Sequence, residues 1–169
     1  TENRWNAPVS RRVHRPRRIS SKVGSRKSEV GRAKTVAIIR SAKELEVYKL
    51  AFSLSMEIFE LSKNFPIEER FALTSQIRRS SRSVCMNLRE AWAKRRYEAH
   101  FISKITDCDG EASETDTSLD FAYKCAYISA EQHKALTEKC RSVGRMLGKM
   151  LQNPKGFLIS DLRPLISDL

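Results

Sequence analysis

Glycine and proline are scarce in this chain, with six and five among 169 residues. This scarcity disfavours a turn-rich β fold and favours long helices. No run of about 18 apolar residues occurs, so we expect no membrane-spanning helix. The cysteines Cys85, Cys108, Cys125 and Cys140 lack CxxC spacing and fall within helical patterns. We therefore expect reduced thiols that act as small hydrophobic side chains in the cytoplasm, with a disulfide framework as the alternative.

Recognisable catalytic and metal-binding signatures are also missing. The three histidines are isolated, and the Glu-x-x-His pairs of a di-iron bundle do not occur. Neither a P-loop, a dinucleotide-binding glycine pattern nor a nucleophile elbow is found. Asp107, Glu111 and Glu114 share a helix face, but without a neighbouring histidine they fit a salt-bridged surface better than a cation site. We predict a non-catalytic protein with no catalytic residue, metal or cofactor.

Positive charge is concentrated near the beginning of the chain. Residues 1–40 contain 12 of the 32 Lys and Arg residues and only two acidic residues, Glu2 and Glu29. The rest of the chain has 20 basic and 18 acidic residues, so it is nearly neutral. Because residues 1–40 have no sustained apolar period, we predict a disordered basic arm. Their Arg-rich, Ser-rich composition is also typical of organelle transit peptides, so a misassigned N-terminus is the alternative.

Four helical patterns with short connections follow the arm. They predict an all-α, antiparallel, up-down four-helix bundle over residues 41–153, followed by a C-terminal tail at 154–169. The expected helices cover about 41–63, 66–96, 98–126 and 129–153. Capping-box spacings, Ser41 with Glu44 and Ser129 with Gln132, mark the start of the first and last helices. Gly110 interrupts the pattern of the third helix.

The segment Phe71–Arg96 is the most informative part of the sequence. One face of the expected helix is apolar, with residues 3, 4 or 7 positions apart: Leu73, Ile77, Val84, Leu88 and Ala91. A second stripe lies about 120–140° around the helix and consists of Arg78, Arg82, Arg89 and Arg96. One side of this helix can therefore pack in a core while the other binds anions.

The arginine stripe has two interpretations. Guanidinium groups match the geometry of phosphates, and a seven-residue repeat spaces them about 10.5 Å apart, which suits several phosphates. The candidate nucleic-acid-binding residues are Arg78, Arg79, Arg82, Arg89, Lys94, Arg95 and Arg96. Alternatively, these arginines pair with the acidic residues of the third helix, within the chain or across a subunit contact. The acidic residues concerned are Asp107, Asp109, Glu111, Glu114, Asp116 and Asp120.

Trp92 lies between the apolar and basic faces of the same helix. An aromatic side chain in this position could stack on a base, but it is more typical of a rim or a subunit contact. We predict Trp92, Glu114 and Asp116 as oligomer contacts.

Several strings of residues resemble one protein family. They are EVYKLAFSLSMEIFELSKNFP (46–66), EERFALTSQIRRSSRSV (68–84), NLREA (87–91) and VGRML (143–147). The chain resembles the S23-type four-helix bundle proteins, which are encoded within intervening sequences of bacterial 23S rRNA genes. The resemblance covers about residues 44–152, and TSQIRR (74–79) is its most specific part. The family usually has proline where this chain has Cys85, and residues 1–40 have no counterpart in it.

The resemblance implies a bundle that assembles into a homopentameric ring. It also implies kinship with the accessory variability proteins of diversity-generating retroelements, which bind nucleic acid and a reverse transcriptase. We therefore expect a bacterial, cytoplasmic scaffold that self-associates and binds RNA or other nucleic acid, with a reverse transcriptase as a further partner. The alternative is a protein–protein interaction or assembly module with no direct nucleic-acid role.

Overall fold

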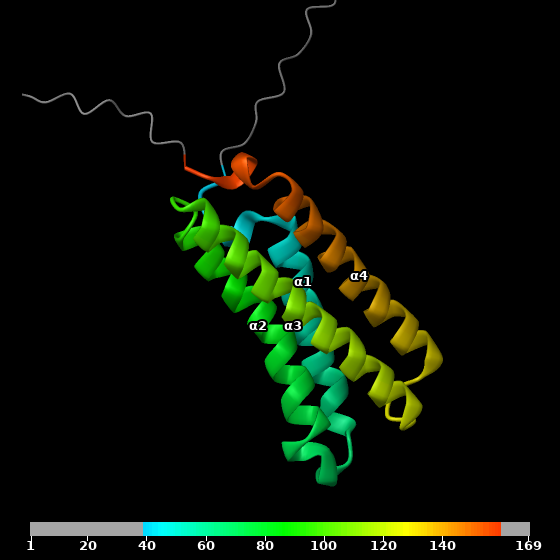
Figure 1. The fold of residues 1–169 in the computed structure, drawn as a ribbon. Helices are drawn as coiled ribbons and strands as arrows, with labels where there is room; N and C mark the ends of the chain where they lie inside the picture. The colour runs from blue at the N-terminus through cyan, green and yellow to red at the C-terminus, as the bar shows by residue number, and fades with distance from the viewer. Residues whose placement is uncertain (1–38, 160–169) are drawn as a thin grey trace, which may run out of the picture. The chain divides into compact units, whose positions relative to one another are not determined.

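Four α-helices form an antiparallel bundle in the computed structural model, which describes residues 39–159. The helices are α1 (Glu46–Leu61), α2 (Leu73–Ala93), α3 (Glu98–Lys124) and α4 (Ala130–Gln152). They run alternately up and down, and each packs against its neighbours in the order α1, α2, α3, α4 and back to α1 (Figure 1). The predicted all-α four-helix bundle is confirmed. The predicted disorder of the arm falls almost entirely outside the described residues.

Short 3-10 turns connect or flank the helices. They are η1 (Ala42–Glu44), η2 (Ser62–Asn64), η3 (Ile67–Phe71) and η4 (Pro154–Phe157). The ring of Phe157 stacks on that of Phe101 with centroids 6.1 Å apart, so the start of the predicted tail lies against the bundle. Among the helices at 39–159, none combines the length and the hydrophobicity that crossing a bilayer requires.

Helix α2 is shorter than predicted at both ends. It begins only at Leu73, because Ala72 leaves the helical region with φ −109° and ψ −111°. The Glu69 carboxylate accepts a hydrogen bond from the Leu73 amide at 3.1 Å and so caps the new first turn. After Ala93 the chain turns away, and residues 94–96 belong to the α2–α3 turn. The expectation that Arg96 continues the helical stripe is therefore wrong.

The apolar face predicted for α2 is buried as expected. Leu73, Ile77, Val84, Leu88 and Ala91 are each 9% exposed or less. Helix α2 packs most extensively against α3. Small polar side chains lie in this contact: the Thr115 hydroxyl donates to the Ser80 hydroxyl at 2.9 Å, and both residues are buried. Because these side chains are short, the two helices approach closely while their buried hydroxyls remain hydrogen-bonded.

Two expectations about helix boundaries have different outcomes. The capping box of Ser129 and Gln132 is present at the start of α4. Ser41, however, caps only the short η1 turn by accepting from the Lys43 amide, and α1 starts five residues later. Gly110 does not interrupt α3, because it lies on the exposed face, where an added Cβ would meet nothing within 4 Å.

All four cysteines are free thiols, as predicted. Cys85, Cys108 and Cys140 are buried, and burial raises their pKa to about 11, 12 and 12. These three act as small hydrophobic side chains at neutral pH, since almost none of the reactive thiolate is present. Cys125 is different: it ends α3 and is exposed, so its expected place among the apolar side chains is wrong.

The two faces of α2 predict opposite effects of substitution on stability. Leu88→Ala removes a side chain that is 1% exposed and should lower the free energy of unfolding by about 2–5 kcal/mol. Met86 lies on the opposite side of the same helix and is 64% exposed. Met86→Ala should therefore change the free energy of unfolding by less than about 0.5 kcal/mol. Urea unfolding followed by circular dichroism measures both. Equal effects would mean that the rotation of α2 is assigned wrongly.

Candidate nucleic-acid interface

Three of the predicted arginines converge on one hollow of about 560 Å³ along the outer side of α2. Arg78, Arg79 and Arg82 line it, and Arg70 and Phe71 of η3 close one end. Sequence reasoning missed Arg70. The signal that could have found it is the four-residue spacing of Arg70, Thr74, Arg78 and Arg82, which extends the stripe towards the start of the helix.

A second, smaller hollow of about 280 Å³ adjoins the first. The two share Arg70, Thr74 and Arg78, and the second adds Lys63 of η2. We call these two hollows together the α2 basic surface. Five cationic side chains from η2, η3 and α2 thus face the same stretch of solvent: Lys63, Arg70, Arg78, Arg79 and Arg82.

Within residues 39–159, no ion pair of 4.0 Å or less includes Arg70, Arg78, Arg79 or Arg82. Two acidic residues of α3 pair elsewhere: Lys104 contacts Asp107 at 3.1 Å, and His133 contacts Asp120 at 2.7 Å. Pairing of these arginines within the chain is therefore not observed. Pairing across a subunit contact stays a prediction.

The Phe59 ring is a shared contact of three of these cations. Lys63 Nζ lies 4.7 Å from the centroid of the Phe59 ring, and the Cζ atoms of Arg78 and Arg82 lie 5.0 and 5.4 Å from it. Arg78 Nε also donates to Ser62 Oγ at 2.7 Å. These contacts hold three cations close together. Lys63 also pairs with the Glu60 carboxylate at 2.6 Å, whereas Arg78 and Arg82 are in no ion pair within residues 39–159. The local positive potential therefore remains available to an anion.

The acidic face of α3 is itself under electrostatic strain. Burial, and then the neighbouring Glu114, raises the pKa of Glu111, although Arg79 acts in the opposite direction. Burial likewise raises the pKa of Asp116, with Asp120 as the second cause. Within the described part of the chain, one carboxylate oxygen of each of Glu111, Glu114 and Asp116 is shielded from solvent without a hydrogen-bond partner. This leaves the predicted oligomer contacts Glu114 and Asp116 half-buried.

The remaining predicted residues lie at the other end of α2. Arg89 donates to Ser41 Oγ at 3.1 Å. The Cζ atom of Arg95 lies 4.2 Å from the ring centroid of Trp92, and Arg95 also donates to the Trp92 carbonyl. Trp92 is half-buried against the core, and Lys94 and Arg96 are exposed in the turn. The predicted stripe therefore divides into the α2 basic surface and a separate group near the α2–α3 turn.

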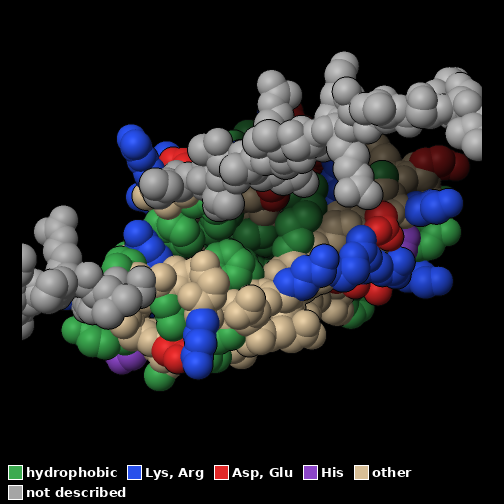
Figure 2. All heavy atoms as spheres, turned by 90° about the horizontal axis from the view of Figure 1, so that it is seen from above, with side chains coloured by type: hydrophobic (Ala, Val, Ile, Leu, Met, Phe, Trp, Pro, Cys, Tyr) green, Lys and Arg blue, Asp and Glu red, His purple; other side chains and the backbone are tan. Residues whose placement is uncertain are grey.

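Cationic side chains are not confined to α2. Figure 2 shows Lys and Arg side chains at both sides of the face seen from above, with hydrophobic side chains between them. Helix α4 also presents exposed cations, including Arg141 and Lys149. These supply matched controls for charge changes on α2.

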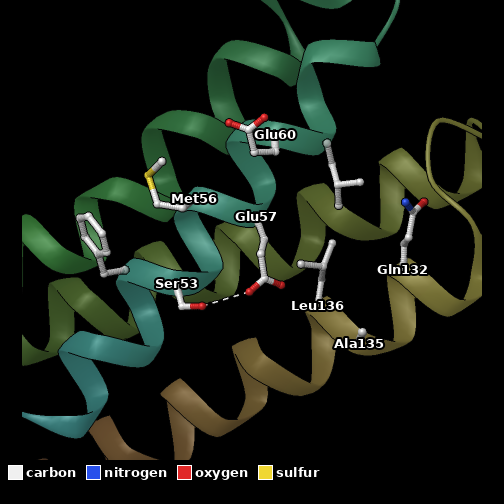
Figure 3. A pocket seen from close by; sticks show the side chains of 9 residues that line it. Ser53, Met56, Glu57, Glu60, Gln132, Ala135 and Leu136 are labelled. Atoms are coloured by element: carbon white, nitrogen blue, oxygen red, sulfur yellow. Dashed lines mark hydrogen bonds between the residues drawn. The ribbon is translucent and has the colours of Figure 1, made fainter.

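A further hollow of about 630 Å³ lies between α1 and α4 and is mainly apolar (Figure 3). Phe52 and Met56 of α1 are 51% and 43% exposed there, and Leu136 of α4 forms part of the wall. Lys139 of α4 bonds to Glu57 of α1 at 2.6 Å beside it. With few polar groups and no cation on its walls, this hollow suits a protein contact better than a phosphate. In residues 39–159, no three His, Cys, Asp or Glu side chains are placed to share a metal ion.

Residues 43–149 match the family described as 23S rRNA-intervening sequence protein. The chain belongs to this family. A crystal structure of a protein with unknown function from the S23 ribosomal protein family of Bacteroides thetaiotaomicron VPI-5482 is 27% identical, with a TM-score of 0.57. The match covers 63% of this chain and 95% of that chain. A comparison with curated proteins gave no match.

The matched range of this 23S rRNA-intervening sequence protein includes both hollows of the α2 basic surface. The specific string TSQIRR (74–79) provides Thr74, Arg78 and Arg79 of that surface. Residues 1–42 and 150–169 lie outside the match. The α2 basic surface therefore lies within the part of the chain that matches the family.

The strained acidic face predicts a pH-dependent stability difference. Because the pKa of Asp116 is raised in the folded state, its ionisation favours unfolding, and the cost appears as the pH rises through the unfolded and then the folded pKa. Asp116→Asn should therefore raise the melting temperature at pH 7, and the gain should shrink near pH 4. Asp109→Asn, an exposed α3 control, should show little change at either pH. A lower melting temperature for Asp116→Asn at pH 7 would contradict this account.

Proposed function

We propose that this protein is a non-catalytic, homo-oligomeric scaffold that binds RNA or other nucleic acid through the α2 basic surface. The observation that carries the proposal is that five cations converge on adjoining hollows and that, within residues 39–159, none of the four arginines among them is in an ion pair with a carboxylate. Lys63 of η2 pairs with the carboxylate of Glu60, which lies near the end of α1. Arg79 lies near enough to Glu111 of α3 to oppose the rise in the pKa of that carboxyl, but no ion pair of 4.0 Å or less joins them within residues 39–159.

Arginine favours phosphate in such a setting for two reasons. Its planar guanidinium donates two parallel hydrogen bonds to phosphate oxygens, and it is more weakly hydrated than an ammonium group. Arg78 and Arg82 lie one turn apart, about 6 Å along the helix, so several phosphates of one strand can be contacted at once. Neutralising each phosphate releases counterions, which makes the affinity depend on salt.

Self-association is the second part of the proposal. The half-exposed Phe52 and Met56 leave apolar surface between α1 and α4 that a subunit contact would cover. The family resemblance implies a homopentameric ring, in which a weak contact per subunit is multiplied by avidity. Trp92, Glu114 and Asp116 remain the proposed contact residues. A cytoplasmic location and a reverse-transcriptase partner belong to the same proposal.

One observation favours the alternative of a protein–protein interaction module. The hollow of about 630 Å³ between α1 and α4 is mainly apolar, and no Lys or Arg lines it. In that case the α2 arginines would meet acidic residues of a partner, and nucleic acid would play no role.

Arg79 and Arg82 are both exposed and are in no ion pair within residues 39–159, so replacing them tests the nucleic-acid-binding role of the α2 basic surface directly. Arg79→Gln/Arg82→Gln in the full chain should weaken binding of a structured RNA at least tenfold. The slope of log affinity against log salt should fall by about 1.4–1.8, since two phosphate contacts are lost. Arg141→Gln/Lys149→Gln removes the same charge from α4 and should change affinity less than twofold. Fluorescence anisotropy at several salt concentrations measures both.

Equal losses in the two double variants would show that RNA responds only to total charge, and the α2 basic surface would lose its proposed role. Loss of the oligomer in Arg79→Gln/Arg82→Gln would instead support subunit pairing by these arginines.

The assembly is tested by light scattering coupled to gel filtration. A homopentamer of a 19.4 kDa chain should show about five times that mass. A mass of one subunit at micromolar concentration would remove the ring from the proposal.

A further inference from the structure

Phe71 is the most exposed large hydrophobic side chain in the described part of the chain, at 87%. It is the last residue of η3, and its ring borders the hollow lined by Arg78, Arg79 and Arg82. Leaving a phenylalanine in water forgoes the free energy that its burial would provide. A ligand that covers the ring therefore gains affinity from this side chain alone.

The cations around the ring define the chemistry of that ligand. Arg70 Cζ lies 5.3 Å from the centroid of the Phe71 ring, so a cation already faces part of it. Other arginines of the same hollow lie further along α2. An aromatic side chain beside a row of cations is the arrangement with which proteins bind single-stranded nucleic acid: bases stack on the ring while phosphates contact the cations.

The hollow continues along α2 as far as Met86, which is 64% exposed. From the start of α2 to Met86 the helix rises about 20 Å, which is long enough for several nucleotides. Thr74 lies between the two hollows of the surface, is only 7% exposed, and its Oγ1 has no hydrogen-bond partner within residues 39–159. An acceptor such as a phosphate oxygen between Arg70 and Arg78 would satisfy this hydroxyl after a rotation of the side chain.

We propose that the α2 basic surface binds a single-stranded segment of RNA with an unpaired base stacked on Phe71. This inference rests on the proposed RNA-binding function and names its ligand more closely. A duplex keeps its bases stacked inside and presents phosphates alone, so it engages the arginines without the ring. Phe71 thereby favours single-stranded RNA over duplex RNA.

The experiment compares two fluorescein-labelled probes, a uridine dodecamer, which cannot pair with itself, and a twelve-base-pair RNA duplex. Both are titrated with the full chain at one salt concentration. Phe71→Ala should weaken dodecamer binding by about 5- to 100-fold, the range expected for loss of one stacked base. Duplex affinity should change less than twofold. Phe71→Tyr keeps a ring and should retain dodecamer binding, whereas Phe71→Leu, which keeps hydrophobic bulk without a ring, should not.

The outcomes separate this inference from the function on which it rests. If Phe71→Ala and Phe71→Leu bind the dodecamer like the unaltered protein while Arg79→Gln/Arg82→Gln does not, the stacking inference fails and the RNA-binding function stands. If no variant changes affinity for either probe, both fail. A lower oligomer mass for Phe71→Ala by light scattering would make Phe71 a subunit contact and overturn the inference. Because Phe71 is exposed, each variant is expected to fold, which circular dichroism checks.

Discussion

The rotation of α2 about its own axis determines the properties of this molecule more than any other feature. Ile77, Val84 and Leu88 must face the core, and the buried hydroxyls of Ser80 and Thr115 fix the contact with α3. Since successive residues are separated by about 100° around a helix, burying one face forces Arg78 and Arg82 to the outside. The positive surface is therefore a consequence of core packing, and any sequence change that turned α2 would move it.

The electrostatics of the outer surface follow from this arrangement. Asp107 and Asp120 of α3 pair with Lys104 and His133. Arg78 and Arg82 of α2 lie beside the Phe59 ring. Neighbouring like charges destabilise the unbound protein slightly, and a bound polyanion removes that cost. The same reasoning explains why an almost neutral bundle can still present a strongly positive site. The total charge of the bundle is small, so the positive potential of this surface depends on the spacing of the charged side chains and on which partners they contact.

The sequence predicted the bundle well because hydrophobic periodicity is clear in α1, α2 and α4, although it is weak in α3. The buried face of α2 was identified residue by residue. The sequence predicted the ends of α2 poorly. The break at Ala72 depends on the η3 turn and on capping by Glu69. The turn after Ala93 depends on backbone hydrogen bonds. Neither of these two features produces a periodic pattern in the sequence. Arg70 and Phe71 of η3 were also missed as parts of the surface, although Arg70 continues the four-residue spacing of Thr74, Arg78 and Arg82. Arg89 and Arg95 were grouped with the others because helical spacing cannot show that Ser41 and Trp92 bind them.

The central claim is that core packing turns the α2 arginines outward as a phosphate-binding surface. Arginine-specific modification with phenylglyoxal, followed by mass spectrometry with and without a structured RNA, tests it at single residues. Arg78, Arg79 and Arg82 should react readily in the protein alone and be protected several-fold by RNA, while Arg141 and Arg145 on α4 keep their reactivity. Protection confined to α4 or to the basic arm, with the α2 arginines still reactive in the presence of RNA, would contradict the account.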